Sequence, residues 1–187
     1  LIFNSGYNIL NGFHPFKDYW SITGPLLDYL QSIIFLVFDI SWLTYVMHAA
    51  IINAVLAIFI FFFFNKLQLS KNLSFVYAIG ISILAYPSTG TPFMDHHAVI
   101  FSLVSICCFV LGVNENRKIY WFLSSFFIVF SFFSKQIPSA YLIFLLFSSI
   151  IFYKIYFKEK HFSDVIFFVL GGMASIIIFL IIFYVNQ

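Results

Sequence analysis

Three short segments, far apart in the sequence, carry ionisable side chains of the kinds that acid–base and phosphate chemistry use. The first is residues 15–29, which include Lys17 and Asp18. The second is residues 95–97, an Asp followed by two His, and the third contains Lys135. These groups are conspicuous because Lys, Arg, Asp and Glu together make up 9% of the chain, against about 25% in an ordinary soluble domain. The three segments are therefore the candidates for a chemically active site.

Lys17 and Asp18 are predicted to lie in a polar loop beside Tyr19 and Trp20. One interpretation is a solvated loop with aromatic side chains at a membrane interface. The functional interpretation is a carboxylate and an ammonium beside an anionic head group, because Lys binds phosphate as a point charge. On that interpretation Asp18 is a catalytic candidate, and Lys17 and Tyr19 are substrate-binding candidates. Asp28 is interpreted as a water-facing residue of an amphipathic surface helix.

Asp95, His96 and His97 stand where a polar loop leads into an apolar segment. An Asp at the start of a helix is a favourable cap and dipole partner, so a structural role would explain Asp95. Three ionisable residues in a row, in so apolar a chain, favour a catalytic Asp95 and a substrate-binding His96. Asp18, His96 and His97 are also candidate ligands of a divalent metal, the one cofactor this set suggests. Adjacent His residues rarely share one metal, so other loops would have to supply further ligands.

Lys135 lies between two apolar segments. A Lys at the centre of a membrane span costs about 2.5–3.5 kcal/mol on insertion scales, and less near its end. A structural interpretation is a terminal Lys whose long side chain reaches water. The functional interpretation is a substrate-binding Lys that contacts the phosphate of a lipid carrier.

The composition indicates a membrane protein with several spans. Hydrophobic residues are 63% of the chain, and the mean hydropathy is +1.03. A soluble core of this length does not need so much apolar material. The two cysteines, Cys107 and Cys108, are adjacent inside an apolar segment and are interpreted as small buried apolar residues.

We predict an all-α bundle of about six transmembrane helices with an outer juxtamembrane helix. A span needs about 20 residues, so the shorter apolar segment 25–38 is predicted to lie along the membrane surface. The predicted spans are residues 42–64, 73–86, 97–113, 119–133, 138–157 and 165–185.

The distribution of Lys and Arg predicts the orientation. Seven lie in loops on one side of this arrangement: Lys66, Lys71, Arg117, Lys118, Lys154, Lys158 and Lys160. Two, Lys17 and Lys135, lie on the other side. The positive-inside rule places the side with seven in the cytoplasm. Residues 15–29, 87–95 and 134–136 are therefore all expected at the outer surface.

The chain is expected to be a single transmembrane domain, 1–187, truncated at both ends. Its first residue is Leu1 and its last residues directly follow an apolar segment. Residues 1–41 are expected to form an outer loop with juxtamembrane helices, and residues 42–187 the transmembrane helices.

Residues 11–38, 91–103 and 133–146 together resemble the polyprenyl-phosphate-sugar-dependent glycosyltransferases of the GT-C fold. The resemblance is to the bacterial branch similar to dolichyl-phosphate-mannose protein mannosyltransferases and to the aminoarabinose transferase of lipid A. Each motif is short, and their order, spacing and common outer side make the resemblance more specific than any one of them.

The resemblance implies roles for particular residues. Asp18, Gly24 and Pro25 fit the first outer loop of that family, which carries acidic residues and a Gly-Pro-Leu pattern. Asp95 fits an acidic residue at the outer start of a later span. Lys135 fits a Lys that contacts the carrier phosphate.

The chain also departs from the family pattern. The principal catalytic Asp of the family follows the first span, and no Asp precedes Asp18 here, so the resemblance places it upstream of Leu1. Asp39 stands where Gly is usual, and the Arg expected at the start of the next span has no match, although His48 is near.

The resemblance implies a membrane glycosyltransferase that moves a sugar from a polyprenyl-phosphate carrier to a glycan, lipid or protein acceptor. It also implies a bacterial inner-membrane protein whose site faces the periplasm, among membrane lipids and without nucleic acid. A transporter or flippase of lipid-linked saccharides is an alternative, which ionisable residues buried mid-span would favour. A polysaccharide polymerase or ligase is another, which Arg residues in the outer loops would favour.

Overall fold

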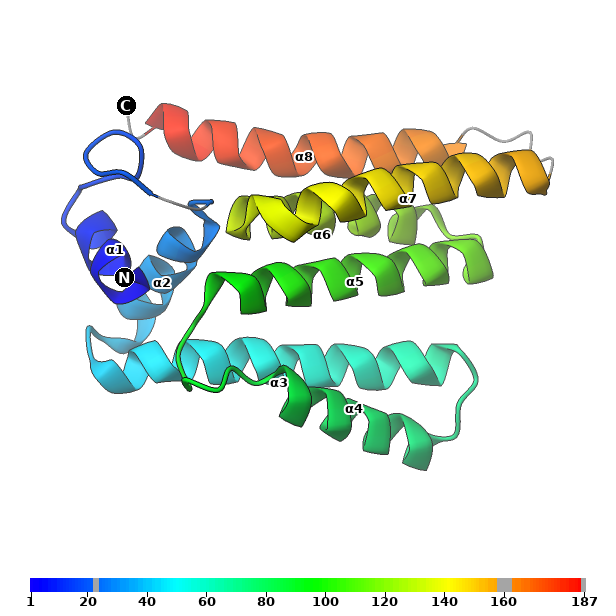
Figure 1. Ribbon diagram of the computed structural model, residues 1–187, viewed down its shortest axis with the longest axis horizontal. Coiled ribbons are helices and arrows are strands. Elements are labelled where there is room, and N and C mark those ends of the chain that lie inside the picture. The colour runs from blue at the N-terminus through cyan, green and yellow to red at the C-terminus, as the bar shows by residue number, and fades with distance from the viewer. Residues whose placement is uncertain (22–23, 158–162, 186–187) are drawn as a thin grey trace.

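The computed structural model describes residues 1–21, 24–157 and 163–185, and the regular elements of these residues are all α-helices (Figure 1). The helices are α1 (Ile2–Leu10), α2 (Leu26–Phe38), α3 (Trp42–Lys66), α4 (Lys71–Ala85), α5 (Met94–Glu115), α6 (Lys118–Ser134), α7 (Gln136–Tyr156) and α8 (Ser163–Val185). The predicted all-α class is confirmed.

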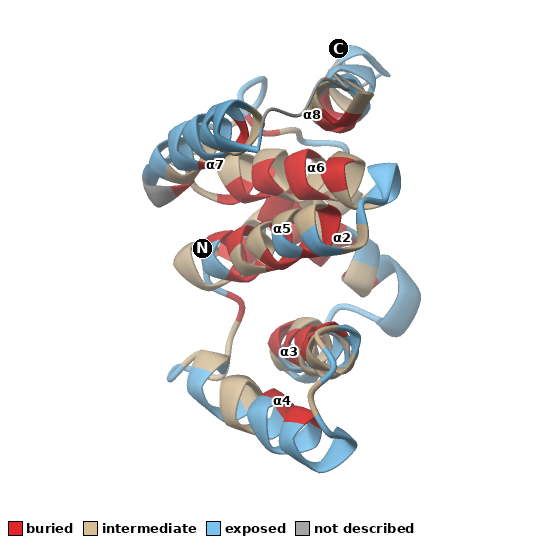
Figure 2. Cartoon of the chain, turned by 90° about the vertical axis from the view of Figure 1, so that its right-hand side faces the viewer, coloured by how far each residue is buried: buried red, intermediate tan, exposed pale blue. Residues whose placement is uncertain are grey.

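Helices α3 to α8 run side by side, and α1 and α2 lie across one end of this bundle (Figure 1). Helix α5 packs against α6, α6 packs against α8, and α3 packs against α4. Seen end-on, α3 and α4 lie on one side of α5, and α6, α7 and α8 lie on the other (Figure 2).

Four helical segments in the described residues are long and apolar enough to cross a membrane, which supports an integral membrane protein. They are Trp42–Lys66, Met94–Glu115, Ser139–Tyr156 and Ser163–Val185. Helices α4 and α6 have 15 and 17 residues. At 1.5 Å per residue, 15 residues rise about 22 Å, less than the roughly 30 Å of a bilayer core. The count of six spans therefore stays a prediction.

Local sequence signals explain where several helices begin and end. Ser41 and Ser70 cap α3 and α4, because their hydroxyls accept hydrogen bonds from the backbone N–H of Thr44 and Leu73. Helix α5 ends at Asn116, which adopts the left-handed conformation that Asn tolerates. Ile137 is non-helical within α7 because it precedes a proline.

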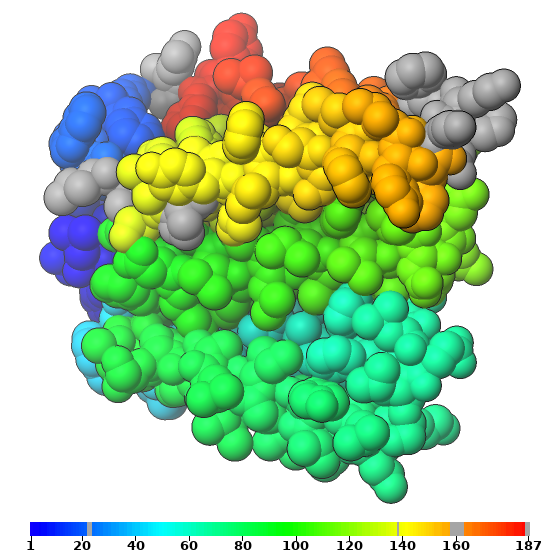
Figure 3. Space-filling view, turned by 45° about the vertical axis from the view of Figure 1, so that its right-hand side comes forward, coloured from blue at the N-terminus to red at the C-terminus, as the bar shows by residue number. Residues whose placement is uncertain are grey.

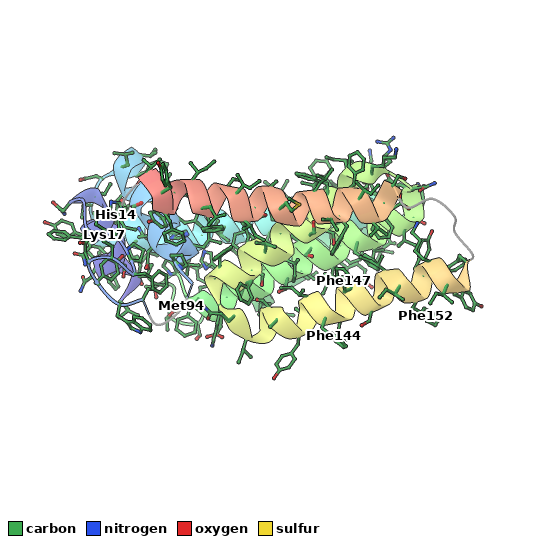
Figure 4. All side chains as sticks on the ribbon, turned by 90° about the horizontal axis from the view of Figure 1, so that it is seen from above. His14, Lys17, Met94, Phe144, Phe147 and Phe152 are labelled. Atoms are coloured by element: carbon green, nitrogen blue, oxygen red, sulfur yellow. The ribbon has the colours of Figure 1, made fainter. Side chains whose placement is uncertain are left out.

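Large apolar side chains cover the outward faces of the bundle. Helices α7, α5 and α4 form one broad face (Figure 3), and burial is concentrated on the inward faces (Figure 2). Phe144 and Phe152 of α7 are exposed (Figure 4), as are Leu84 of α4 and Leu180 of α8. Contiguous apolar surface of this kind fits contact with lipid chains.

Small and hydroxylated residues join the inner helices. Ser105 donates to the Ser124 carbonyl over 2.6 Å, and Ser131 donates to the Ala98 carbonyl over 2.7 Å. A Cβ at Gly171 of α8 would lie 2.0 Å from the Phe122 carbonyl oxygen, so only glycine permits this approach to α6. Such close contacts are typical of helix packing in membranes.

Candidate functional site

The three segments that carry the candidate residues lie at the same end of the bundle. This end holds α1, α2, the start of α5 and the junction between α6 and α7 (Figure 1). The α3–α4 and α5–α6 connections and the end of α7 lie at the opposite end. We call the first the site end and the second the far end.

Asp95 and Lys135 form an ion pair between the first turn of α5 and the α6–α7 junction. Lys135 has an extended backbone between the two helices, and its ammonium contacts Asp95 Oδ1. The side chains are 36% and 44% exposed for Lys135 and Asp95, respectively. Helix α5 has no side-chain cap bond. The capping role considered for Asp95 is therefore not seen, and its carboxylate neutralises Lys135.

His96 lies beside this ion pair, at a cavity of about 470 Å³. The cavity is lined by Asp95, His96 and the loop that contains Pro87 and Thr89. The two ring nitrogens of His96 are buried and make no hydrogen bond of normal geometry within the described residues. The nearest polar partner of the His96 ring is the Ala85 backbone at the end of α4.

Asp18 lies in a loop that is closed by its own hydrogen bonds. The Asp18 carboxylate accepts a hydrogen bond of 2.8 Å from the His14 backbone N–H, and the Phe16 N–H donates to the Tyr19 carbonyl over 2.8 Å. Lys17 and Asp18 are exposed, and Figure 4 shows Lys17 at the tip of the site end. The geometry gives Asp18 a structural role in the loop, and its catalytic role stays a prediction.

The three candidate metal ligands do not converge. Within the described residues, no group of three or more His, Cys, Asp and Glu side chains is close enough to hold a metal ion. His97 is fully buried and directs both ring nitrogens to protein partners, whereas Asp18 is exposed in its loop. Asp18, His96 and His97 are therefore not assembled around one point in this structure, and a divalent metal stays a prediction.

Asp28 is 4% exposed, so the interpretation of this residue as water-facing is wrong. The polar residues of α2 lie on its buried face, together with the apolar Leu27 and Phe35, and the opposite face is entirely apolar. Asp28, Gln31, Ser32 and Phe35 are buried at the helical spacing i, i+3, i+4 and i+7. The exposed residues of α2 are Ile33, Leu36, Val37 and Phe38. The spacing could have revealed the mixed face, but not the direction in which it points.

A cavity of about 200 Å³ lies beside Asp28. Its polar lining comprises Asn4, Ser5, Asn8, Tyr19, Ser21 and Asp28, and Leu1, Trp20 and Met94 also border it. We call this cavity the Asp28 pocket. It combines one buried carboxylate with amide and hydroxyl groups from α1 and from the loop before α2.

Burial controls the protonation of the Asp28 pocket. It raises the pKa of the Asp28 carboxyl to about 6, although hydrogen bonds from the Ser5 and Ser21 hydroxyls oppose this shift. Ser21 Oγ lies 3.4 Å from Asp28 Oδ2. Burial and the neighbouring Asp28 carboxylate also raise the pKa of the Tyr19 phenol. The carboxyl therefore exchanges its proton near neutral pH, while the phenol keeps its proton.

Two glycines bring the parts of the site end together. A Cβ at Gly24 would lie 1.7 Å from the Phe133 carbonyl oxygen, two residues before Lys135. A Cβ at Gly6 would lie 2.6 Å from Gln31 Cγ. The Gly-Pro pattern at 24–25 thus lets the chain that enters α2 touch the end of α6.

A chain of buried side chains links α2 to two spanning helices. Gln31 Oε1 lies 2.8 Å from His48 Nδ1, and His48 Nε2 lies 3.2 Å from His97 Nε2. His97 Nδ1 lies 3.0 Å from the Phe93 carbonyl oxygen. Gln31, His48 and His97 are fully buried, so they anchor α2 on α3 and α5.

The contacts determine the tautomers of a neutral histidine pair. The Phe93 carbonyl only accepts, so His97 Nδ1 carries the proton and His97 Nε2 accepts from His48. His48 Nδ1 is then an acceptor, and Gln31 must present its amide NH₂ group to it. This orientation also gives the amide nitrogen of Gln31 a partner. In the opposite orientation Gln31 Nε2 is buried and has no partner in the described residues. The contacts among Gln31, His48 and His97 were not predicted from the sequence, since 17 residues separate the first two and 49 separate the last two.

Comparisons of the chain with protein-family models, with curated proteins and with solved structures find no match. The functional proposal therefore rests on the geometry of the site end and on the resemblance of its three segments to a known family.

Proposed function

We propose that this chain is part of a membrane glycosyltransferase of the GT-C fold, which transfers a sugar from a polyprenyl-phosphate carrier to an acceptor. The observation that carries the proposal is the half-exposed Asp95–Lys135 ion pair at the site end, beside the Asp28 pocket. A lipid-linked phosphate has its charge at the membrane surface, where such a pair can meet it. In this proposal the bundle has six spans and its site end faces the outside.

Lys135 is the phosphate-binding residue in this proposal. Its ammonium has one carboxylate partner and remains 36% exposed, so a phosphate can approach it from the water side. Exposed ion pairs contribute about 0–1 kcal/mol, so exchanging Asp95 for a phosphate oxygen costs little. Lys17, which is exposed at the same end, supplies a second cation.

The reaction is a substitution at the anomeric carbon of the sugar. The acceptor hydroxyl oxygen forms a bond to this carbon, and the bond from the carbon to the phosphate oxygen breaks. The phosphate leaves with the bonding electron pair, and Lys135 stabilises its charge. A carboxylate at the site end takes the hydroxyl proton as general base.

Reconstituted full-length protein tests this proposal. Vesicles containing polyprenyl-phosphate sugars are incubated with the protein, and release of free polyprenyl phosphate is measured, a readout that does not require the acceptor to be known. Lys135→Ala is expected to lower the release about 100-fold, in line with the loss of one charge-stabilising group. The matched control is Lys66→Ala, which removes a Lys from an exposed ion pair at the far end. Equal release by wild type and Lys135→Ala, or no release from any carrier sugar, would refute the proposal.

A saccharide transporter is a second candidate function, supported by the buried His48–His97 pair. Ionisable side chains buried within spanning helices are typical of transport pathways. The discriminating measurement is flux: a transporter moves lipid-linked saccharide across the vesicle membrane without cleaving it. For a polymerase or ligase there is no comparable observation, because Arg117, the one Arg of the chain, lies at the far end.

A further inference from the structure

We infer that the Asp28 pocket binds a neutral saccharide ring, held by the Asp28 carboxylate and the side-chain amides of Asn4 and Asn8. This inference deepens the proposed function, because it assigns the sugar or the glycan acceptor to a subsite apart from the phosphate-binding Lys135. The pocket is defined by its own residues and not by the transfer reaction. Binding of a saccharide to it can therefore be measured whether or not the protein transfers a sugar.

The lining of the pocket matches a group with many hydroxyls. Asn4 and Asn8 lie one helical turn apart on α1, so their amides face the same side, and each can donate and accept. Ser5, Ser21 and Tyr19 add three hydroxyls that also do both. A sugar ring offers alternating donors and acceptors, and can therefore satisfy this mixture.

Asp28 provides the strongest contact. Asp28 is buried, with an exposed fraction of 4%, and a hydrogen bond to a charged group is worth roughly twice a neutral one. The Ser21 hydroxyl donates to one of its oxygens over 3.4 Å. A carboxylate has about four acceptor positions, so it can also accept from ligand hydroxyls.

The Tyr19 hydroxyl is a further polar group at the pocket. It lies close enough to the Asp28 carboxylate and the Ser5 hydroxyl to interact with both, but it makes no hydrogen bond of normal geometry within the described residues. Buried polar atoms without a well-formed hydrogen bond are rare in native proteins and call for an explanation. A hydroxyl of the bound ring can complete the hydrogen bonding of Tyr19.

The size and the mouth of the pocket fit one ring. Its volume is about 200 Å³, whereas pockets that enclose drug-sized ligands have about 300–1,000 Å³. Trp20 borders the pocket and is 81% exposed. Its indole therefore offers an apolar face against which the C–H face of a sugar can lie.

The charges exclude two other ligand classes. The lining contains no Lys or Arg side chain, and the amino group of Leu1 is already opposite Asp28, so a phosphate or a carboxylate group would meet Asp28 without a further compensating cation. An ammonium group would satisfy Asp28, but it accepts no hydrogen bonds and would leave the amide and hydroxyl donors unpaired. A neutral ring satisfies both the carboxylate and the surrounding donors.

Binding of methyl glucoside, methyl mannoside and methyl galactoside to the purified full-length protein tests the inference. Saturation-transfer NMR at pH 7.5 is expected to detect at least one of them. Asp28→Asn and Asn8→Ala are expected to weaken that binding about tenfold each, because each removes a buried hydrogen-bonding group. Glucuronate and methylamine are expected to bind at least tenfold more weakly than the neutral glycoside.

The matched control is Asp39→Asn, which changes an exposed carboxylate that follows α2 and lies outside the pocket lining. It is expected to leave the affinity unchanged. No binding of any of the three glycosides, unchanged binding in both pocket variants, or preference for methylamine would overturn the inference. Binding without release of polyprenyl phosphate would retain the pocket and refute the transfer reaction, so the two failures are distinguishable.

Discussion

Each end of the bundle holds a Lys–Asp ion pair that joins two helices, and the two pairs differ in their access to water. At the far end, Lys154 Nζ lies 2.6 Å from Asp164 Oδ2, and the side chains are 11% and 10% exposed. At the site end, the Lys135 and Asp95 side chains are 36% and 44% exposed. The same pair of residue types is thus buried in one place and open in the other.

The difference in burial indicates a difference in role. Removing one partner of a buried pair leaves an uncompensated charge and costs about 3–5 kcal/mol, whereas an exposed pair contributes about 0–1 kcal/mol. The Lys154–Asp164 pair therefore holds α7 to α8. The Asp95–Lys135 pair can open at small cost, which is what a group that binds an anionic substrate requires.

The largest expected effect is a loss of stability when the buried ion pair at the far end is removed. Lys154→Ala leaves the Asp164 carboxylate buried without its cation and should lower the free energy of unfolding by about 3–5 kcal/mol. Lys135→Ala should lower it by less than about 1 kcal/mol. Denaturant-induced unfolding in detergent, followed by circular dichroism, measures both. Equal losses would show that burial does not separate the two pairs.

The second prediction concerns the close approach that builds the site end. Gly24→Ala places a Cβ 1.7 Å from the Phe133 carbonyl oxygen, so the chain entering α2 must move away from α6. We expect a loss of about 1–3 kcal/mol, as for other overpacked positions. Gly80→Ala is the control, because a Cβ there meets no atom within 4 Å. Thermal unfolding of the two variants compares them, and a Gly24→Ala protein as stable as wild type would contradict the contact.

The third prediction gives the site end a dependence on pH. Burial raises the pKa of Asp28 from 3.8 to about 6, so the folded protein holds this proton more tightly than the unfolded chain. The resulting stability is fully present below pH 3.8 and is lost as the pH rises through about 6. Between pH 4 and pH 7 the wild type should lose about 2 kcal/mol relative to Asp28→Asn. Unfolding measured at several pH values tests this, and parallel pH profiles would exclude a raised pKa.

The smallest expected effect lies in the loop of Asp18. Asp18→Asn keeps an oxygen that can accept from the His14 N–H, and the residue is exposed, so the free energy of unfolding should change by less than about 0.5 kcal/mol. Because stability is preserved, the release of polyprenyl phosphate by this variant reports on catalysis alone. Loss of release would support Asp18 as a catalytic residue, and full release would leave the base to another carboxylate of the site end.

The class of the protein and the grouping of its polar segments follow from the amino-acid sequence without the fold. Long apolar stretches separated by short polar loops require spanning helices, because a backbone in lipid must satisfy its own hydrogen bonds. Spans that alternate in direction bring every second loop to the same end, so residues 15–29, 95–97 and Lys135 are expected together without any knowledge of packing. The short length of segment 25–38 likewise predicted a helix that does not span, and α2 lies across the end of the bundle.

Which side chains meet depends on the packing of the helices. The two faces of α2 can be read from the sequence, but their direction cannot, because lipid is as apolar as a protein core and an apolar face is stable against either. The structure turns the entirely apolar face of α2 outward and buries the mixed face, which holds Asp28 and Gln31 beside Leu27 and Phe35. The pairing of Asp95 with Lys135 and of His48 with His97 joins residues 40 and 49 positions apart. Such contacts depend on the relative rotation and depth of whole helices, which no local pattern in the sequence specifies.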